Sequence, residues 1–175
     1  MVRAADPPGA GGVPLSGPAS GRPLFLEDVA TGQVYESTGR TITEADVVAF
    51  AGVSGDWNQI HTNVEYARDT PYGQRVVYGL LTLSVLTGLL DRTGLFSGST
   101  IAMLGIEWTF AAPVFVGDTL SFRLTIAGVR RTRAGNRGIV QRHFELFNQR
   151  GETVGHGRLD AVVRARTSMP PGPDR

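Results

Sequence analysis

The sequence predicts an α+β domain in which a long antiparallel sheet wraps around one apolar helix. Three observations lead to this prediction. Residues 78–91 carry apolar side chains on nearly every face of a helix, so this helix should be enclosed on most sides. From residue 100 onward the apolar period changes to two, which is typical of strands. Short turns separate these strands, as expected of antiparallel neighbours.

The chain has 175 residues, which suits one domain. We expect that domain at residues 23–166, between flexible tails at residues 1–22 and 167–175 that are rich in small residues and proline. The first tail lacks the apolar core of an export signal. The most apolar stretch, residues 76–90, is shorter than the ~20 residues of a membrane helix, so no membrane association is predicted.

Composition excludes several kinds of chemistry. The formal net charge of +1 argues against nucleic acid as a partner. All 17 basic residues are arginine, so no lysine can form a Schiff base. The chain has no cysteine, which excludes disulfides, thiol nucleophiles and cysteine-based metal sites and fits a cytoplasmic location.

The first helix is predicted from its end signals. Thr43 is a good N-cap and acidic residues follow it in the first turn, where they suit the helix dipole. Ile42 and Val47 can form a hydrophobic staple across the cap. Gly52 and Gly55 are expected to end the helix.

The other elements follow from periodicity and turn residues. Residues 33–41 are expected to form a strand, and residues 54–77 a loop with a short helical turn that starts at Asn63. In the second half, Gly117-Asp118 is expected to be a turn between two strands. The strands predicted there cover residues 100–110, 120–126, 138–147 and 153–164.

Asp56 and His61 carry the chemical signal. Residues five apart do not share a helix face, but a loop that contains Gly55 can turn both side chains toward one point. There a carboxylate and an imidazole can hold one water, so that one takes its proton while the other donates to a substrate. The alternatives are that Asp56 caps a turn and His61 is a partly buried structural histidine, or that the two bind a metal. No metal is expected, because the other two histidines lie in distant strands.

The wider sequence resembles the MaoC-like dehydratase family of R-specific enoyl-CoA hydratases. The resemblance covers nearly all of residues 24–166, in the right order. Three stretches carry it: Ser54-Gly55-Asp56-x-Asn58-x-Ile60-His61 with Ala67, then Tyr78-Gly79-Leu80-Leu81, and Phe110-Ala-Ala-Pro113-Val-Phe-Val-Gly117-Asp118-Thr119-Leu120.

The resemblance implies a hot-dog fold, a homodimer, and reversible hydration of a 2-enoyl thioester without metal or redox cofactor. Asp56 and His61 take the family's catalytic positions, and Asn58 takes the position that helps to hold the loop and the water. Gly79 takes the position whose backbone N–H contacts the thioester carbonyl. This role suits a helix start, where free amides and the dipole stabilise the negative charge that forms on that oxygen. The thioester carrier is expected to be CoA, or otherwise an acyl carrier protein.

Two residues depart from the family pattern. Gln59 replaces the usual proline, so the loop is expected to be less rigid. Tyr78 replaces the usual histidine before Gly79. Neither change removes a catalytic side chain.

Further side chains are predicted to contact the substrate. Those near the central helix are Tyr78, Leu80, Thr82, Ser84 and Thr87. Arg131 and Arg133 lie in an arginine-rich turn between two strands, where they are expected either to bind the phosphates of CoA or simply to be solvated. Two other functions stay open from the residues alone: a hot-dog thioesterase, and a non-catalytic subunit that binds acyl thioesters.

Overall fold

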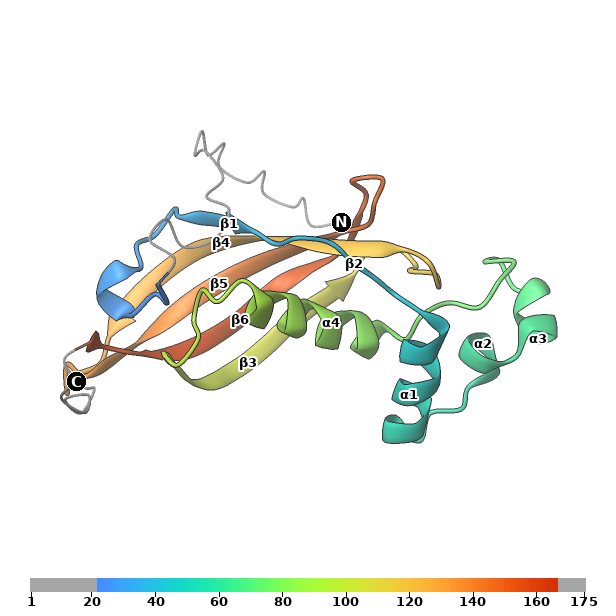
Figure 1. Ribbon diagram of the computed structural model, residues 1–175, viewed down its shortest axis with the longest axis horizontal. Helices are drawn as coiled ribbons and strands as arrows, with labels where there is room; N and C mark the ends of the chain where they lie inside the picture. Colours follow the sequence, from blue (N-terminus) through green and yellow to red (C-terminus); the bar gives the residue numbers. More distant parts are fainter. Residues whose placement is uncertain (1–21, 167–175) are drawn as a thin grey trace, which may run out of the picture.

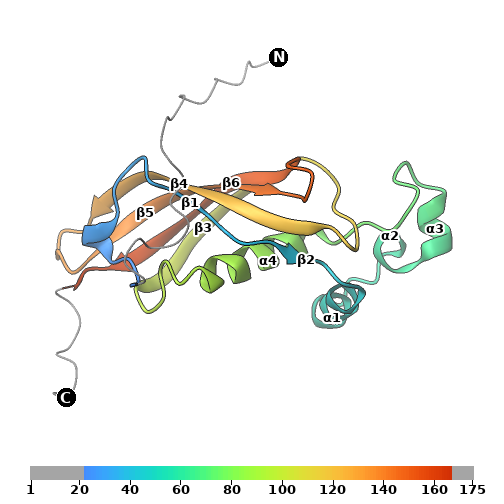
Figure 2. The same ribbon diagram turned by 45° about the horizontal axis from the view of Figure 1, so that its top comes forward.

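The computed structural model describes residues 22–166, so the tails expected on either side fall outside the described residues, except for residue 22. The fold is α+β: an antiparallel sheet lies along one long helix, α4 (Gly79–Arg92), as Figures 1 and 2 show. This confirms the predicted hot-dog architecture. The neighbouring strands are, in order, β1 (Val34–Glu36), β4 (Thr119–Arg131), β5 (Arg137–Phe147), β6 (Thr153–Arg164) and β3 (Thr100–Phe110), and the short β2 (Arg40–Thr41) also pairs with β4. The expected strand at residues 33–41 is therefore two short strands.

The core lies between α4 and the inward face of the sheet. Along β5, and along β4 as far as Ile126, every second residue is buried, as the period of two predicted. Phe122 and Phe144 meet edge to face with ring centroids 5.4 Å apart, which is a favourable geometry for two aromatic rings. From α4 the core takes Leu81, Thr82, Leu83, Val85, Leu86 and Leu89. Leu80, in contrast, is 63% exposed, so one face of α4 is uncovered in the single chain.

The predicted turn between β3 and β4 is not a hairpin. Strand β3 pairs with β6, and β4 pairs with β5 and β1, so the two strands lie in different parts of the sheet. Residues 111–118 therefore cross from one strand to the other, and β3 is left as an edge strand of the sheet. The predicted turn at Gly117-Asp118 does form, since Gly117 has φ of 95° and the Asp118 amide donates to the Phe115 carbonyl over 3.0 Å. A Gly-Asp turn is equally compatible with strands that pair directly and with strands that lie apart, so it did not reveal the crossing.

Helix α1 (Glu44–Ser54) begins as its sequence predicts. The Thr43 side chain accepts a hydrogen bond from the Asp46 amide, and the Asp46 side chain bonds back to the Thr43 amide, which forms a capping box. Gly55 ends the helix in the left-handed conformation, with φ of 71°. Gly52, however, lies within the helix and does not end it.

Short helices connect α1 to α4. They are α2 (Gln59–Thr62), which the sequence did not reveal, and α3 (Val64–Arg68), whose N-cap is the expected Asn63. One turn of 3-10 helix, η1 (Leu26–Asp28), precedes β1 at the opposite end of the sheet. No helix in residues 22–166 is long and apolar enough to span a bilayer.

Candidate active site

A tightly bonded loop places Asp56 after α1. The Asp56 amide donates to the Ser54 hydroxyl over 3.2 Å, and the Asp56 carboxylate accepts from the Asn58 amide over 3.0 Å. Asn58 in turn caps α2, because its side-chain oxygen accepts from the Ile60 amide over 3.2 Å. Asp56 therefore leads directly into the short helix that carries His61.

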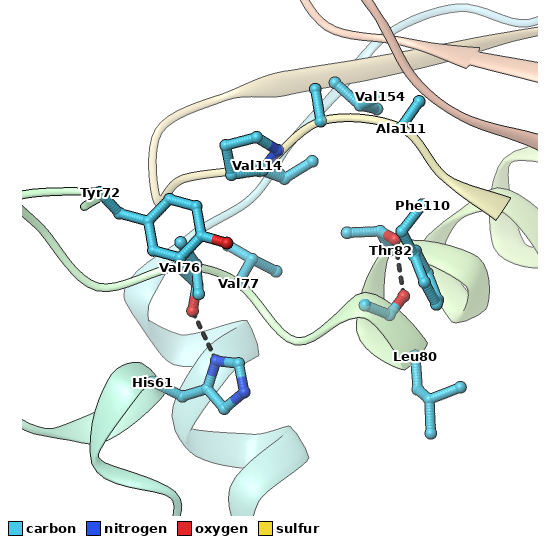
Figure 3. Close-up of a pocket in the computed structure, with 13 residues that line it drawn as sticks. His61, Tyr72, Val76, Val77, Leu80, Thr82, Phe110, Ala111, Val114 and Val154 are labelled. Carbon is cyan, nitrogen blue, oxygen red and sulfur yellow. Dashed lines mark hydrogen bonds between the residues drawn. The ribbon is translucent and has the colours of Figure 1, made fainter. Parts of the chain in front are cut away.

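A backbone carbonyl orients His61. The Nδ1 atom of His61 lies 2.8 Å from the oxygen of Val76, which Figure 3 shows as a dashed line. Since a carbonyl can only accept, Nδ1 carries a proton and donates it. In the neutral ring this leaves Nε2 as the basic nitrogen, so the imidazole is fixed in the tautomer that can exchange a proton through Nε2.

Tyr78 connects the two predicted catalytic residues. Its hydroxyl donates to the backbone oxygen of Asp56 over 2.7 Å. Its ring packs on the ring of His61, with centroids 3.9 Å apart and planes 34° apart, and on Phe50, with centroids 5.1 Å apart. Tyr78 is also the N-cap residue of α4, so these contacts lie at the start of the central helix.

Next to His61 is a cavity of about 450 Å³ (Figure 3). Most of its wall is apolar, and His61 contributes an ionisable group to it. Its other lining residues are Tyr72, Val76, Val77, Gly79, Leu80, Thr82, Phe110, Ala111, Ala112, Pro113, Val114 and Val154. The cavity can therefore accept an apolar group and present it to an imidazole.

Gly79 forms the part of the wall where α4 begins. The amides of a first helical turn lack intrahelical partners and lie at the positive end of the dipole, so they suit an oxygen that gains negative charge. A side chain at this position would collide, because a Cβ built on Gly79 lies 2.9 Å from two ring atoms of Phe110. Thr82 is turned toward the same point, and its hydroxyl donates to the Gly79 carbonyl over 2.6 Å (Figure 3).

Only some of the other predicted substrate contacts line the cavity. Leu80 and Thr82 line the cavity, whereas Tyr78, Ser84 and Thr87 do not. The hydroxyls of Ser84 and Thr87 donate to carbonyls of α4 itself. Asp56 and Asn58 are exposed and also lie outside the cavity lining, so the structure brings the Asp56 backbone to Tyr78 without placing its carboxylate in the cavity wall.

The arginine-rich turn lies far from this cavity. Arg131 and Arg133 are at the β4–β5 turn, beside η1, at the opposite end of the sheet from α2 and α3 (Figure 1). Arg131 donates to Glu27 over 3.0 Å and to the Gly135 carbonyl over 2.5 Å, while Arg133 is exposed. Within one chain, these arginines are not part of the site.

The sequence did not reveal that the crossing between β3 and β4 lines the cavity. Residues 111–114 of this crossing form one wall together with Val154 of β6, whose carbonyl accepts from the Ala111 and Ala112 amides over 3.0 and 3.3 Å. Hydrogen bonds fasten the crossing to the segment before α4, because the Val77 amide donates to the Val114 carbonyl over 2.7 Å. The interruption of the period of two after Phe110 was the one sequence signal for this wall.

An ion pair connects the start of α1 to the same segment. Arg75 donates to both carboxylate oxygens of Glu44, over 2.9 and 2.7 Å. These hydrogen bonds lower the pKa of Glu44 and raise the pKa of Arg75.

Burial raises the pKa of Tyr78, and the charge of Asp56 raises it further. The Tyr78 hydroxyl therefore keeps its proton and remains a donor near neutral pH.

Within residues 22–166, no group of three or more histidine, aspartate or glutamate side chains could hold a metal ion.

Comparisons show which known proteins the chain is similar to. Residues 27–145 match the family model described as MaoC like domain. The chain is 32% identical over 146 residues to the (R)-specific enoyl-CoA hydratase of Rhodospirillum rubrum, covering 81% of this chain and 93% of that protein.

Solved structures give the same result. The MaoC-like dehydratase from Rhodospirillum rubrum superposes with a TM-score of 0.72 at 30% identity, over 82% of this chain and 98% of that one. Rv0216 from Mycobacterium tuberculosis, described as a double hot-dog fold, superposes with a TM-score of 0.71 over 86% of this chain and 47% of that one. At 18% identity, the second likeness concerns the fold alone.

Proposed function

The chain belongs to the MaoC-like domain family, and we propose that it catalyses the reversible addition of water to a 2-enoyl thioester, which yields a 3-hydroxyacyl thioester. One observation carries the proposal. His61, which a backbone carbonyl orients, and Gly79, in the first turn of α4, line the same apolar cavity. Tyr78 contacts both His61, through its ring, and the backbone of Asp56, through its hydroxyl.

The reaction needs a base, an acid and a site for negative charge. In hydration, the water oxygen bonds to C3 of the enoyl group while the π electrons move toward the carbonyl oxygen as an enolate. A proton then bonds to C2 and the carbonyl re-forms. Water supplies all the added atoms and nothing is oxidised or reduced, so the chemistry requires no redox cofactor.

The residues suit these three tasks. Asp56 and His61 hold the water, one taking its proton and the other donating to C2, and His61 exchanges its proton through Nε2. The Gly79 amide donates to the carbonyl oxygen as charge develops there. A preorganised donor of this kind lowers the barrier by roughly 3 kcal/mol.

We propose CoA as the thioester carrier, with an acyl carrier protein as the alternative. The Rhodospirillum rubrum relative is named as an enoyl-CoA hydratase, which supports the first choice. Binding of CoA phosphates by Arg131 and Arg133 stays a prediction. Because these arginines and the cavity lie at opposite ends of one chain, the contact would have to cross a subunit interface.

The exposed face of β3 supports a homodimer. β3 lies at an edge of the sheet, and nearly all its residues are exposed. An uncovered edge strand offers unpaired backbone groups to a second strand. It also carries large exposed apolar side chains, namely Ile101, Met103, Leu104, Ile106 and Phe110. Symmetric pairing of β3 with a second copy would cover them.

One assay separates hydration from the two other functions. The protein is incubated with crotonyl-CoA while the enoyl absorbance and free thiol are followed together. Loss of absorbance without thiol supports the proposal, thiol release would indicate a thioesterase, and no reaction would favour a binding role. In a hydratase, Asp56→Asn and His61→Ala should each lower kcat by roughly 10²- to 10⁴-fold. The double variant should be little worse than either, since both residues act on one water.

A further inference from the structure

Tyr78 is buried at the centre of the candidate site, although it does not line the cavity. Only 2% of its surface is exposed. It directly precedes Gly79 in the chain. Tyr78 is therefore connected to each predicted participant in the reaction: to Gly79 through the chain, to Asp56 through its hydroxyl and to His61 through its ring.

We propose that Tyr78 is a positioning residue that fixes Asp56 and His61 relative to the amide of Gly79. The inference rests on the proposed function and assigns to Tyr78 a role other than the substrate contact predicted from the sequence. Its hydroxyl acts on the Asp56 backbone and its ring acts on the His61 imidazole.

The hydrogen bond from the Tyr78 hydroxyl attaches the Asp56 loop to a distant part of the chain. Among the described residues, the other hydrogen bonds of Asp56 join it to Ser54 and Asn58, two residues away on either side. Such local bonds shape the loop but do not fix its position relative to α4. The Tyr78 hydroxyl does so, because Tyr78 is the N-cap residue of α4.

The ring contact restricts His61 in a complementary way. The hydrogen bond from Nδ1 to the Val76 carbonyl fixes one atom of the imidazole but permits rotation about that bond. The Tyr78 ring, 3.9 Å away between centroids, covers one face of the imidazole and limits this rotation. Phe50 packs against the Tyr78 ring, so the tyrosine is itself held in place.

The surroundings also keep Tyr78 in its donor form. Burial raises the pKa of its hydroxyl, and the nearby charge of Asp56 raises it further. Its single O–H proton is already donated to the Asp56 carbonyl, and Tyr78 does not line the cavity where a substrate would lie. This favours positioning over acid catalysis for Tyr78.

The test compares Tyr78→Phe with Tyr35→Phe. The first variant keeps the ring and removes the hydroxyl. The second removes a hydroxyl from an equally buried tyrosine, 2% exposed, on β1 and outside the site. With crotonyl-CoA we expect Tyr78→Phe to lower kcat roughly 3- to 10-fold, the effect of one lost hydrogen bond, with KM unchanged. Tyr35→Phe should leave both constants at the wild-type values.

A double-variant cycle separates positioning from a general loss of stability. If Tyr78 acts through Asp56, Tyr78→Phe should lose its effect on kcat in the Asp56→Asn background. A purely structural role would lower kcat by the same factor in both backgrounds. p-Aminophenylalanine at position 78 restores a donor on the same ring and should recover most of the lost activity.

Hydrogen exchange supplies a readout that is independent of catalysis. In Tyr78→Phe, the amides of residues 54–58 should exchange faster than in Tyr35→Phe, because the loop has lost its attachment to α4. Unchanged exchange together with unchanged kcat would overturn the inference. An inactive wild-type protein would instead overturn the proposed function, while the exchange result would still report whether Tyr78 holds the loop.

Discussion

Gly79→Ala tests the helix start as the carbonyl site most directly. The new Cβ would lie 2.9 Å from Cε1 and Cζ of Phe110 and 3.2 Å from Cδ1. The shorter distances are roughly half an ångström below the 3.4 Å at which ordinary contact begins. The Phe110 ring must therefore move, and it can move outward because 52% of that residue is exposed.

Folding and catalysis should respond differently to this change. Overpacking costs about 1–3 kcal/mol, and less where the neighbour can move away. Replacing glycine by alanine in a helix returns about 0.5–1 kcal/mol, so the free energy of unfolding should change little. The added methyl, however, would lie where the thioester approaches the Gly79 amide. A misplacement of about 1 Å costs on the order of 100-fold, so kcat/KM should fall by that factor, or ~2.7 kcal/mol.

The assay is loss of enoyl absorbance with crotonyl-CoA, together with thermal unfolding of the same samples. Gly79→Ala/Phe110→Leu removes the collision with the ring but keeps the methyl. If the methyl blocks the thioester, the double variant stays as slow as Gly79→Ala. Full recovery in the double variant, or a Gly79→Ala protein within threefold of wild type, would refute the reasoning.

Three further predictions concern assembly, stability and carrier binding. Ile106→Arg places a charge on the apolar face of β3 and should convert a dimer into monomers in light scattering. Glu44→Gln removes the pair with Arg75, which is worth less than about 1 kcal/mol because half of the Glu44 side chain is exposed. The pKa of Glu44 in the folded protein lies below its usual 4.5, so the stability that the pair contributes is present above pH 4.5 and is lost as the pH falls through the lowered value. Wild type and Glu44→Gln should therefore have the same melting temperature in acid. Arg133→Ala should raise KM for enoyl-CoA several-fold but not for an enoyl-pantetheine.

Each of these has a clear contrary result. A wild-type protein that is monomeric and active at low micromolar concentration would argue against assembly through β3. A difference in melting temperature between wild type and Glu44→Gln that persists well below pH 4.5 would argue against the ion pair as its source. Equal responses of both thioesters to Arg133→Ala would exclude a CoA phosphate contact at that turn.

Local signals in the sequence predicted the elements that local interactions determine. The cap at Thr43, the left-handed glycine at position 55 and the Asn63 cap depend on side chains within a few residues of one another. The four residues of α2 escaped prediction because one helical turn is too short to show an apolar period.

Strand order depends on contacts that no local pattern encodes. The period of two identifies β3 and β4 equally well whether they pair or lie apart, so the crossing at residues 111–118 was missed, and with it a wall of the cavity. The motif located Asp56 and His61, but the geometry that connects them depends on Tyr78, a residue some twenty positions away along the chain.

The buried Arg142 is another feature of the core that the apolar period did not predict. It occupies an inward position of β5 and is 3% exposed, and its guanidinium carbon lies 5.6 and 5.8 Å from the ring centroids of Phe96 and Phe144. Its Nε donates to the Leu159 carbonyl over 2.7 Å. Burial lowers its pKa to about 10, although the charge of Asp160 opposes this. A period of two marks which face a residue is on, and it does not reveal that a charged residue can be accommodated there.

The acceptor that orients His61 is a peptide carbonyl, and this has a consequence for variation in the chain. An orienting carboxylate can be lost by a single codon change, whereas every amino acid at position 76 brings the same carbonyl oxygen. Saturation mutagenesis of Val76 should thus yield active proteins ranked by how well each side chain fits the apolar cavity. The hydrogen bond depends on the path of the backbone and not on the side chain at position 76, so substitutions there that keep the fold also keep the orientation of His61.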